Sequence, residues 1–196
     1  MTKESATLVR EVLEFWLGPH GHPERGTMRK MWFDKNPELD AEIKHRFLDD
    51  VTDAGRGVLD GLTATCEGVL TLLILLDQFP RNMFRGEARA YAYDAKARAV
   101  ARLAVRMGLD KPLSATERMF IYLPFQHSEE MDDQVRSVAL FKTLPIVPWR
   151  DEVIGIAIQH HDIIARFGRF PHRNAVLGRV STAEELTFLL EPGSGY

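Results

Sequence analysis

Helix start and stop signals recur along the entire sequence, and no stretch alternates polar and apolar residues as a half-buried strand would. The clearest start is Asn36-Pro37, because Asn favours the N-cap and Pro favours the first helical turn. The apolar residues after it stand four apart, at Leu39, Ile43, Phe47 and Val51. That spacing predicts a helix with one buried face, which Gly55 ends.

The same signals predict helices along the rest of the chain. The capping boxes "SATE" (114–117) and "STAE" (181–184) open two of them, and Asp94 is the expected N-cap of another. Gly108 and Gly168 end helices, since glycine fits the left-handed position after the last turn. Helices are therefore expected at about 5–17, 36–55, 66–79, 94–107, 114–123, 128 onward, 151–167 and 181 onward.

The apolar run "VLTLLILL" (69–76) is a segment whose pattern alone does not separate helix from strand. We expect a buried helix, because no neighbouring segment has a strand pattern to pair with it and leucine favours helices. The run is far shorter than the roughly 20 residues that span a bilayer. The sequence thus predicts an all-α protein, a single-domain bundle or superhelix of about eight helices over residues 1–196.

The overall charge and cysteine content favour a soluble cytoplasmic protein. The formal net charge is −3 and the sequence pI is about 6.2, without the basic excess typical of nucleic-acid binding. The single cysteine, Cys66, has no internal disulfide partner, and the N-terminal segment lacks the apolar core of a signal peptide. We expect neither a nucleic acid nor a membrane as partner, and the sequence leaves the oligomeric state open.

Three segments place Pro and Phe side by side next to polar residues: "DQFPRNMF" (77–84), "LPFQHSEE" (123–130) and "FGRFPHRN" (167–174). Each follows an apolar helical pattern, so each is predicted to be a helix exit. Pro80 and Pro171 are expected to stop their helices, because the ring removes a hydrogen-bond donor. Phe79 and Phe170 are expected to plug the core at these exits.

Helices of a bundle that end on the same side would bring the three exits together. An acidic residue there, Asp77 or Glu129, is expected to pair with an arginine, since buried charges are seldom left alone. Arginines in excess of the acids would select a small anionic or polar molecule, because a guanidinium binds carboxylate or phosphate through two bonds. The candidate ligand-binding residues are Asp77, Gln78, Arg81, Asn82, Gln126, Glu129, Arg169, His172, Arg173 and Asn174.

His127 is the candidate catalytic acid/base residue. It lies between a Pro-Phe exit and a predicted helix N-terminus that carries Glu129 and Glu130, and imidazole exchanges protons near neutral pH. His160 falls on the apolar face of its helix and is expected to be a hydrogen-bonded core residue. The spacing of the histidines and acids matches no metal-binding motif, so neither a metal nor another cofactor is predicted.

A structural interpretation of the same residues stays open. Arginine near a helix C-terminus interacts favourably with the dipole and the last carbonyls, and asparagine serves turns. The sequence therefore leaves three functions: a binding protein for a small anionic or polar molecule, an enzyme that uses His127, and a helical scaffold for a protein partner.

Three longer motifs contain these exits: "LLDQFPRNMFRG" (75–86), "YLPFQHSE" (122–129) and "FGRFPHRNAVLGRVSTAEELTFL" (167–189). With these motifs in this order, the chain resembles a bacterial family known as domain-of-unknown-function family 924. The resemblance implies a helical fold similar to tetratricopeptide-type superhelices, and no established biochemical activity. The sequence itself shows no self-similarity near 34 residues, the period of that repeat.

Overall fold

The computed structural model describes residues 2–194, apart from the side chains of Pro23 and Glu24, and every regular element in that range is helical. The α-helices are α1 (Lys3–Leu17), α2 (Pro37–Arg56), α3 (Cys66–Leu73), α4 (Phe79–Met83), α5 (Asp94–Met107), α6 (Ala115–Gln126), α7 (Met131–Phe141), α8 (Arg150–Phe167) and α9 (Ala183–Phe188). Short 3-10 helices connect them: η1 (Pro23–Gly26), η2 (Lys30–Trp32), η3 (Asp60–Ala64), η5 (Ala88–Tyr91) and η6 (Pro171–Arg173). The predicted all-α class is confirmed.

Local sequence signals set most of the helix starts. Asn36 caps α2 with its side-chain oxygen, and Ser114 with Glu117 forms the predicted capping box of α6. The box of α9 lies one residue later than predicted, because Thr182 and Glu185 form it. A side chain three residues before a free backbone N–H can cap it, and "STAEE" offers that spacing twice.

The prediction that Pro80 stops a helix is wrong. The chain runs from α3 into α4 without a break, through the π-helical turn η4 (Ile74–Gln78). In this wide turn the N–H of Phe79 donates to the oxygen of Ile74, five residues back. A wide turn absorbs the missing N–H of a proline and gives its ring room, so the helix continues past Pro80.

The second exit also lies later than predicted, whereas the third matches its prediction. Pro124 lies inside α6, which ends at Gln126, and α7 begins at Met131 rather than at 128. At the third exit Gly168 takes a left-handed conformation with φ 68°, which ends α8, and Pro171 then opens η6.

Aromatic side chains fill the core between α1, α2, α4 and α6. The ring of Phe79 lies 4.9 Å from that of Phe47 and 5.5 Å from that of Trp16, measured between centroids. A smaller apolar cluster gathers Ile163, Ile164 and Phe170 at the end of α8. Phe79 and Phe170 are both fully buried, so the expected plugs are present.

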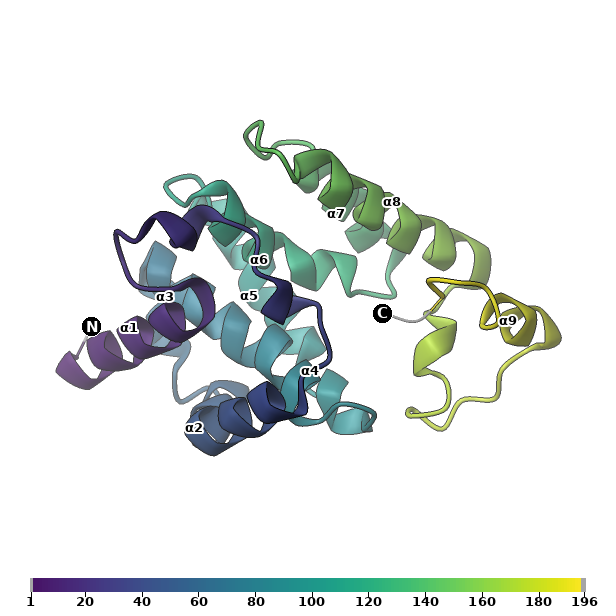
Figure 1. Ribbon diagram of the computed structural model, residues 1–196, viewed down its shortest axis with the longest axis horizontal. Coiled ribbons are helices and arrows are strands. Elements are labelled where there is room, and N and C mark those ends of the chain that lie inside the picture. The colour runs from purple at the N-terminus through teal and green to yellow at the C-terminus, as the bar shows by residue number, and fades with distance from the viewer. Residues whose placement is uncertain (1, 195–196) are drawn as a thin grey trace.

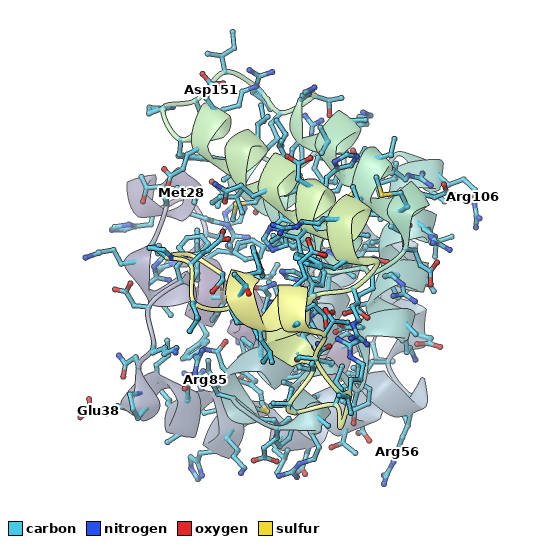
Figure 2. The ribbon with its side chains drawn as sticks, turned by 90° about the vertical axis from the view of Figure 1, so that its right-hand side faces the viewer. Met28, Glu38, Arg56, Arg85, Arg106 and Asp151 are labelled. Atoms are coloured by element: carbon cyan, nitrogen blue, oxygen red, sulfur yellow. The ribbon has the colours of Figure 1, made fainter. Side chains whose placement is uncertain are left out.

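The helices form a larger body and a flanking pair. Figure 1 shows α7 and α8 side by side along one edge of the molecule, with α1 to α5 in the larger body and α9 near the far end of α8. Charged side chains such as Glu38, Arg56 and Arg106 project from the periphery (Figure 2). Within residues 2–194 no helix has the combination of length and apolar character that a membrane crossing needs.

Two glycines permit close approaches inside the larger body. A Cβ on Gly55 would overlap with the ring of Tyr93, and a Cβ on Gly68 would overlap with the carbonyl oxygen of Leu62. These contacts fix the C-terminal half of α2 against the start of α5, and η3 against α3. The first of these packings holds α5, which carries Asp94 of the polar group described next.

Candidate functional site

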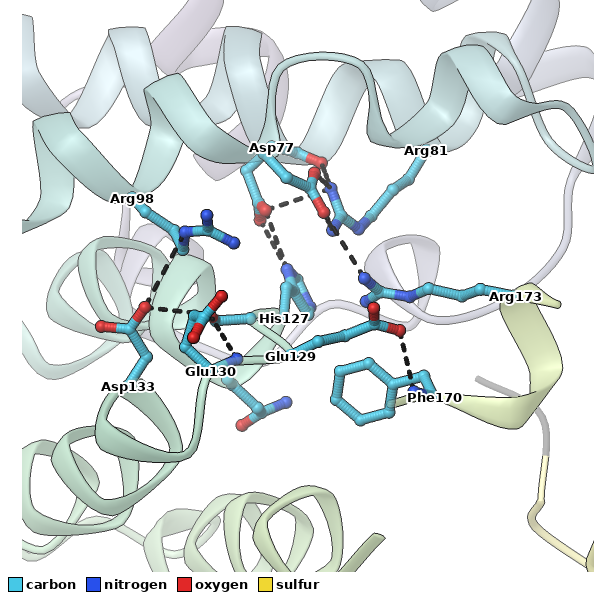
Figure 3. A network of polar contacts seen from close by, with 12 residues as sticks. Asp77, Arg81, Arg98, His127, Glu129, Glu130, Asp133, Phe170 and Arg173 are labelled. Atoms are coloured by element: carbon cyan, nitrogen blue, oxygen red, sulfur yellow. Dashed lines mark hydrogen bonds and ion pairs between the residues drawn. The ribbon is translucent and has the colours of Figure 1, made fainter. Parts of the chain in front are cut away.

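Side chains from distant parts of the chain meet in a group that we call the central cluster. It consists of Asp77 from η4, Arg81 from α4, Asp94 from α5, His127 at the end of α6 and Arg173 from η6. Figure 3 shows Asp77, Arg81, His127 and Arg173 converging from three ribbon segments. The three predicted exits therefore do lie together, although two of them are continuous helix at the proline.

Asp77 is a deeply buried, ionised carboxylate at the centre of this group. Its side chain is 1% exposed and accepts bonds from Nδ1 of His127 at 2.8 and 2.9 Å, and from Nε2 of Gln78 at 2.6 Å. Arg81 Nη1 lies 3.1 Å from the same carboxylate. Burial by itself would raise the pKa of Asp77, but Arg81 and then His127 outweigh it and hold the pKa well below its usual range.

His127 is oriented by this carboxylate. Because an ionised carboxylate only accepts, Nδ1 carries the hydrogen in the contact with Asp77, and Nε2 is the other ring nitrogen. Nε2 makes no hydrogen bond to the described residues, and 16% of the side chain stays exposed. Burial lowers the pKa of His127 below its ordinary value, against the opposing effect of Asp77 and with the support of Arg81. At neutral pH the ring thus presents a neutral Nε2 that can accept a proton.

Arg81 is the main cationic partner of the two carboxylates in the cluster. Its Nη1 and Nη2 each donate to Asp94 at 3.0 Å, and Nη1 also donates to the backbone oxygen of Asp77 at 2.7 Å. Since Arg81 also pairs with the Asp77 carboxylate, this one guanidinium engages both acids of the cluster.

The positive charge of Arg173 has much weaker contacts with carboxylates than that of Arg81. It is only 6% exposed, its Nη1 lies 3.5 Å from the Asp94 oxygen that Arg81 already binds, and its Nε is buried without a hydrogen-bond partner. Its Cζ lies 4.6 Å from the ring centroid of Tyr91 and 4.5 Å from that of Phe170. Burial and then the neighbouring Arg81 lower the pKa of Arg173 to about 10, against the attraction of Asp94.

The central cluster holds two arginines and two acids, so it lacks the excess of arginines that would by itself select an anion. The two arginines differ instead in how they are paired, because Arg81 binds both carboxylates and Arg173 shares only one of them. Asp94 was expected only as a helix cap, and its side chain bonds to Arg81 instead. No local signal marks Asp94 as a site residue, since Arg81 lies 13 positions before it and Arg173 lies 79 positions after it in the chain.

A second ion pair, between Glu129 and Arg179, borders the cluster, and the sequence predicted only its acidic member. Glu129 accepts from Arg179 at 2.7 and 2.9 Å and from the backbone N–H of Phe170 at 2.8 Å. Burial would raise the pKa of Glu129, but the bonds from Arg179 and Phe170 lower it. The predicted pairing of Asp77 and Glu129 with arginines is confirmed, yet Arg179 was not among the candidates.

The two histidines next to Arg173 favour the neutral form, His160 buried and His172 partly buried. His160 packs against Phe170 with 5.4 Å between ring centroids and contacts the oxygen of Ile156 at 2.9 Å, as expected for a core histidine. Burial lowers the pKa of His160 to about 3. Burial and then Arg173 lower the pKa of His172 to about 4.

Two further candidates, Arg169 and Asn174, belong to a separate group that we call the C-terminal cluster. Arg169 binds Glu185 through two bonds of 2.6 and 2.7 Å, and Asn174 donates to Glu185 at 3.3 Å and to Ser181 at 3.0 Å. Glu185 also accepts from the backbone N–H of Thr182. The bond from Arg169 is the main reason that the pKa of Glu185 falls to about 2. This cluster ties α9 to the end of α8.

The remaining candidates have structural contacts. Asn82 donates to Asp40 of α2 at 2.8 Å, away from the central cluster. Gln126 is buried, and its backbone oxygen accepts from Gln134 at 2.8 Å across the turn between α6 and α7. In the part of the chain that the structure describes, no three histidine, cysteine or acidic side chains are grouped as metal ligands.

Two surface cavities lie apart from the central cluster. One of about 480 Å³ lies along the outer face of α2 beside Lys44 and Arg46. The other, of about 250 Å³, lies between α7 and α8 beside Val135 and Ile158. Neither is lined by a residue of the central cluster.

Comparisons with known proteins support the fold and assign no activity. A family model described as "Bacterial protein of unknown function" (DUF924) matches residues 12–193. A solved structure of a protein of unknown function from Agrobacterium tumefaciens is similar over 95% of this chain and 98% of that one, with 40% sequence identity and a TM-score of 0.85. No curated protein matches the chain.

Proposed function

Since this chain belongs to the DUF924 family of bacterial proteins of unknown function, its activity has to be argued from its own site, and we propose that it binds a small anionic molecule at the central cluster. The observation that carries this proposal is the state of Arg173. Its guanidinium is buried, its Nε has no partner, and its nearest carboxylate is already bound by Arg81.

A guanidinium in this state has a physical reason to bind an anion. Burying a charge is costly unless it is paired and hydrogen-bonded, and Arg173 is paired only through the 3.5 Å contact with Asp94. A carboxylate or phosphate would supply short charge-assisted bonds to its free donors. The protein thus keeps a cation in place before a ligand arrives, which lowers the cost of organising the site.

A titration with matched variants tests this proposal. Small anions would be added to wild-type protein and to Arg173→Gln, with binding followed by nuclear magnetic resonance. As a control, Arg85→Gln removes an arginine that pairs with Asp40 outside the cluster. We expect Arg173→Gln to lose binding by at least about tenfold, the effect of one charged bond of about 1.4 kcal/mol, and Arg85→Gln to retain it. Equal affinities in the wild type and Arg173→Gln would contradict the proposal.

An enzyme is the second candidate, and the contact between Asp77 and His127 favours it. A buried carboxylate that fixes Nδ1–H and leaves Nε2 available is an arrangement that serves general acid/base catalysis. Under this alternative, substrate profiling would find a turnover that His127→Gln abolishes while ligand binding persists. Turnover that survives in His127→Gln would count against it.

The binding site would lie in a single domain spanning residues 1–196, in a cytoplasmic protein. Consecutive helices α5 to α8 pack side by side, which supports a superhelix similar to tetratricopeptide proteins as part of this proposal. Fractionation of cells that produce the tagged protein checks the location.

A further inference from the structure

The charges of the central cluster balance when His127 is neutral. Asp77 and Asp94 contribute two negative charges, and Arg81 and Arg173 contribute two positive charges. The bordering pair of Glu129 and Arg179 is balanced as well. An anion bound at Arg173 therefore leaves one negative charge in excess within a largely buried group, and such an excess is costly.

His127 is placed to remove that excess. Nδ1–H donates to Asp77, so a second proton on Nε2 creates an imidazolium that Asp77 stabilises at 2.8 Å. In the unliganded protein the positive charges of Arg81 and Arg173 oppose this protonation, and burial opposes it further. An anion that neutralises Arg173 weakens the opposition, so protonation of His127 and binding of the anion favour each other.

Several charged or titratable groups around His127 enter this balance. Asp77 from η4 attracts the proton, whereas Arg81 from α4 and Arg173 from η6 repel it. His160 from α8 is a buried neutral ring, His172 from η6 is a partly buried neutral ring, and Glu129 is paired with Arg179.

The number of available protons sets the class of ligand. One proton on His127 compensates one negative charge, which is the charge of a carboxylate at neutral pH. Sulfate carries two, and phosphate monoesters carry about 1.5 to 2. The rings of Tyr91 and Phe170 lie against the guanidinium, and its Nε is buried without a hydrogen-bond partner. A planar carboxylate bound in the plane of the guanidinium would supply the missing acceptor.

We infer that the central cluster binds a small monocarboxylate at Arg173 and takes up one proton with it, on Nε2 of His127. This inference rests on the proposed binding of an anion at Arg173 and specifies its ligand and its proton. The ligand carboxylate gains two bonds from Arg173, and the proton comes from solvent, so that the charge of the buried group is unchanged by binding.

Calorimetric titration of the full chain tests the inference. Sodium propionate, sodium benzoate and sodium sulfate would be titrated at pH 7.5 in two buffers of different ionisation enthalpy. We expect a carboxylate to bind with uptake of about one proton, and to bind about tenfold more weakly for each unit rise in pH. His127→Gln should reduce the uptake to near zero, while His161→Gln, beside the surface cavity between α7 and α8, should leave it unchanged.

The outcomes separate this inference from the function on which it rests. Carboxylate binding at Arg173 without proton uptake would overturn the inference and leave the proposed function standing, and so would tighter binding of sulfate than of either carboxylate. Failure of all three anions to bind would overturn both. If His127→Gln does not fold, the ¹⁵N resonances of the His127 ring in wild-type protein test the proton uptake. Nε2 must become protonated when the carboxylate is added, and an Nε2 that stays unprotonated would overturn the inference.

Discussion

Arg169 and Arg173 lie four residues apart in one motif, yet their surroundings differ sharply. Arg169 binds Glu185 through two short bonds and the oxygen of Val180 through a third, which closes the C-terminal cluster. Arg173 has only a 3.5 Å contact with Asp94 and a buried Nε without a partner. The comparison shows that arginines at one helix exit can be fully or poorly paired, and we propose that the poorly paired Arg173 serves a ligand.

Replacing Asp77 should have the largest effect on stability, because Asp77 holds the central cluster together. In Asp77→Asn the partly buried positive charge of Arg81 loses one of its two carboxylates, and His127 loses its charged acceptor. Removing one partner of a buried pair costs about 3 kcal/mol, which urea unfolding would measure. Asp162→Asn, an exposed control, should change the free energy of unfolding by less than about 0.5 kcal/mol. Similar losses of stability in Asp77→Asn and Asp162→Asn would contradict the role of Asp77 in holding the central cluster together.

Glu185→Gln should be the next largest change, because Glu185 joins Arg169, Asn174 and the capping box of α9. Loss of a charged pair and part of a cap predicts a decrease of about 2 kcal/mol in the free energy of unfolding. The neighbouring Glu184→Gln is the control, since Glu184 forms an exposed pair with Arg166 and such pairs contribute little. A Glu185→Gln protein as stable as Glu184→Gln would show that the C-terminal cluster is not the tie described above.

Acid should weaken the two regions in different pH ranges. His172 has a folded-state pKa of about 4 against 6.5 in the unfolded chain, so between these values the unfolded chain binds more protons and stability falls as the pH drops. His160 adds a loss in the same direction that extends to about pH 3. The pKa of Glu185 is lowered from 4.5 to about 2, so its contribution is complete above pH 4.5 and is lost as the pH falls toward 2. Urea unfolding at a series of pH values checks this, and a stability that stays constant from pH 6.5 to 5 would contradict the assignment for the histidines.

Arg173→Gln should have the smallest effect on stability, within about 0.5 kcal/mol of wild type or slightly stabilising. Removing a poorly compensated buried cation also removes the cost of burying it, and Asp94 keeps its two bonds from Arg81. Urea unfolding would show this beside Glu185→Gln. A loss as large as that of Glu185→Gln would mean that Arg173 is a structural tie like Arg169.

Features with a local physical cause were predictable from the sequence. The caps at Asn36 and Ser114 and the left-handed stop at Gly168 each depend on a few neighbouring residues, and the structure has them. Pro80 was predicted to stop a helix because a proline removes a donor. Buried packing on both sides keeps the helix running, and the π-helical turn of η4 absorbs the defect.

The site was predictable only in part, because pairing between distant residues leaves no local pattern. The meeting of Asp77, His127 and Arg173 followed from the assumption that the exits lie together. The partners Asp94 and Arg179 did not, since nothing near them in the sequence signals a contact. Arg169 and Arg173 have similar local surroundings in the sequence, so their different roles emerge only when Glu185 and Asp94 are placed in space.

The most direct test of the poorly paired charge at Arg173 is thermal unfolding with increasing propionate. A ligand that binds the folded protein raises the Tm as its concentration exceeds the Kd. We predict that propionate raises the Tm of wild-type protein and leaves the Tm of Arg173→Gln unchanged. A Tm that rises equally in both proteins, or in neither, would contradict the claim that Arg173 is a cation kept for a ligand.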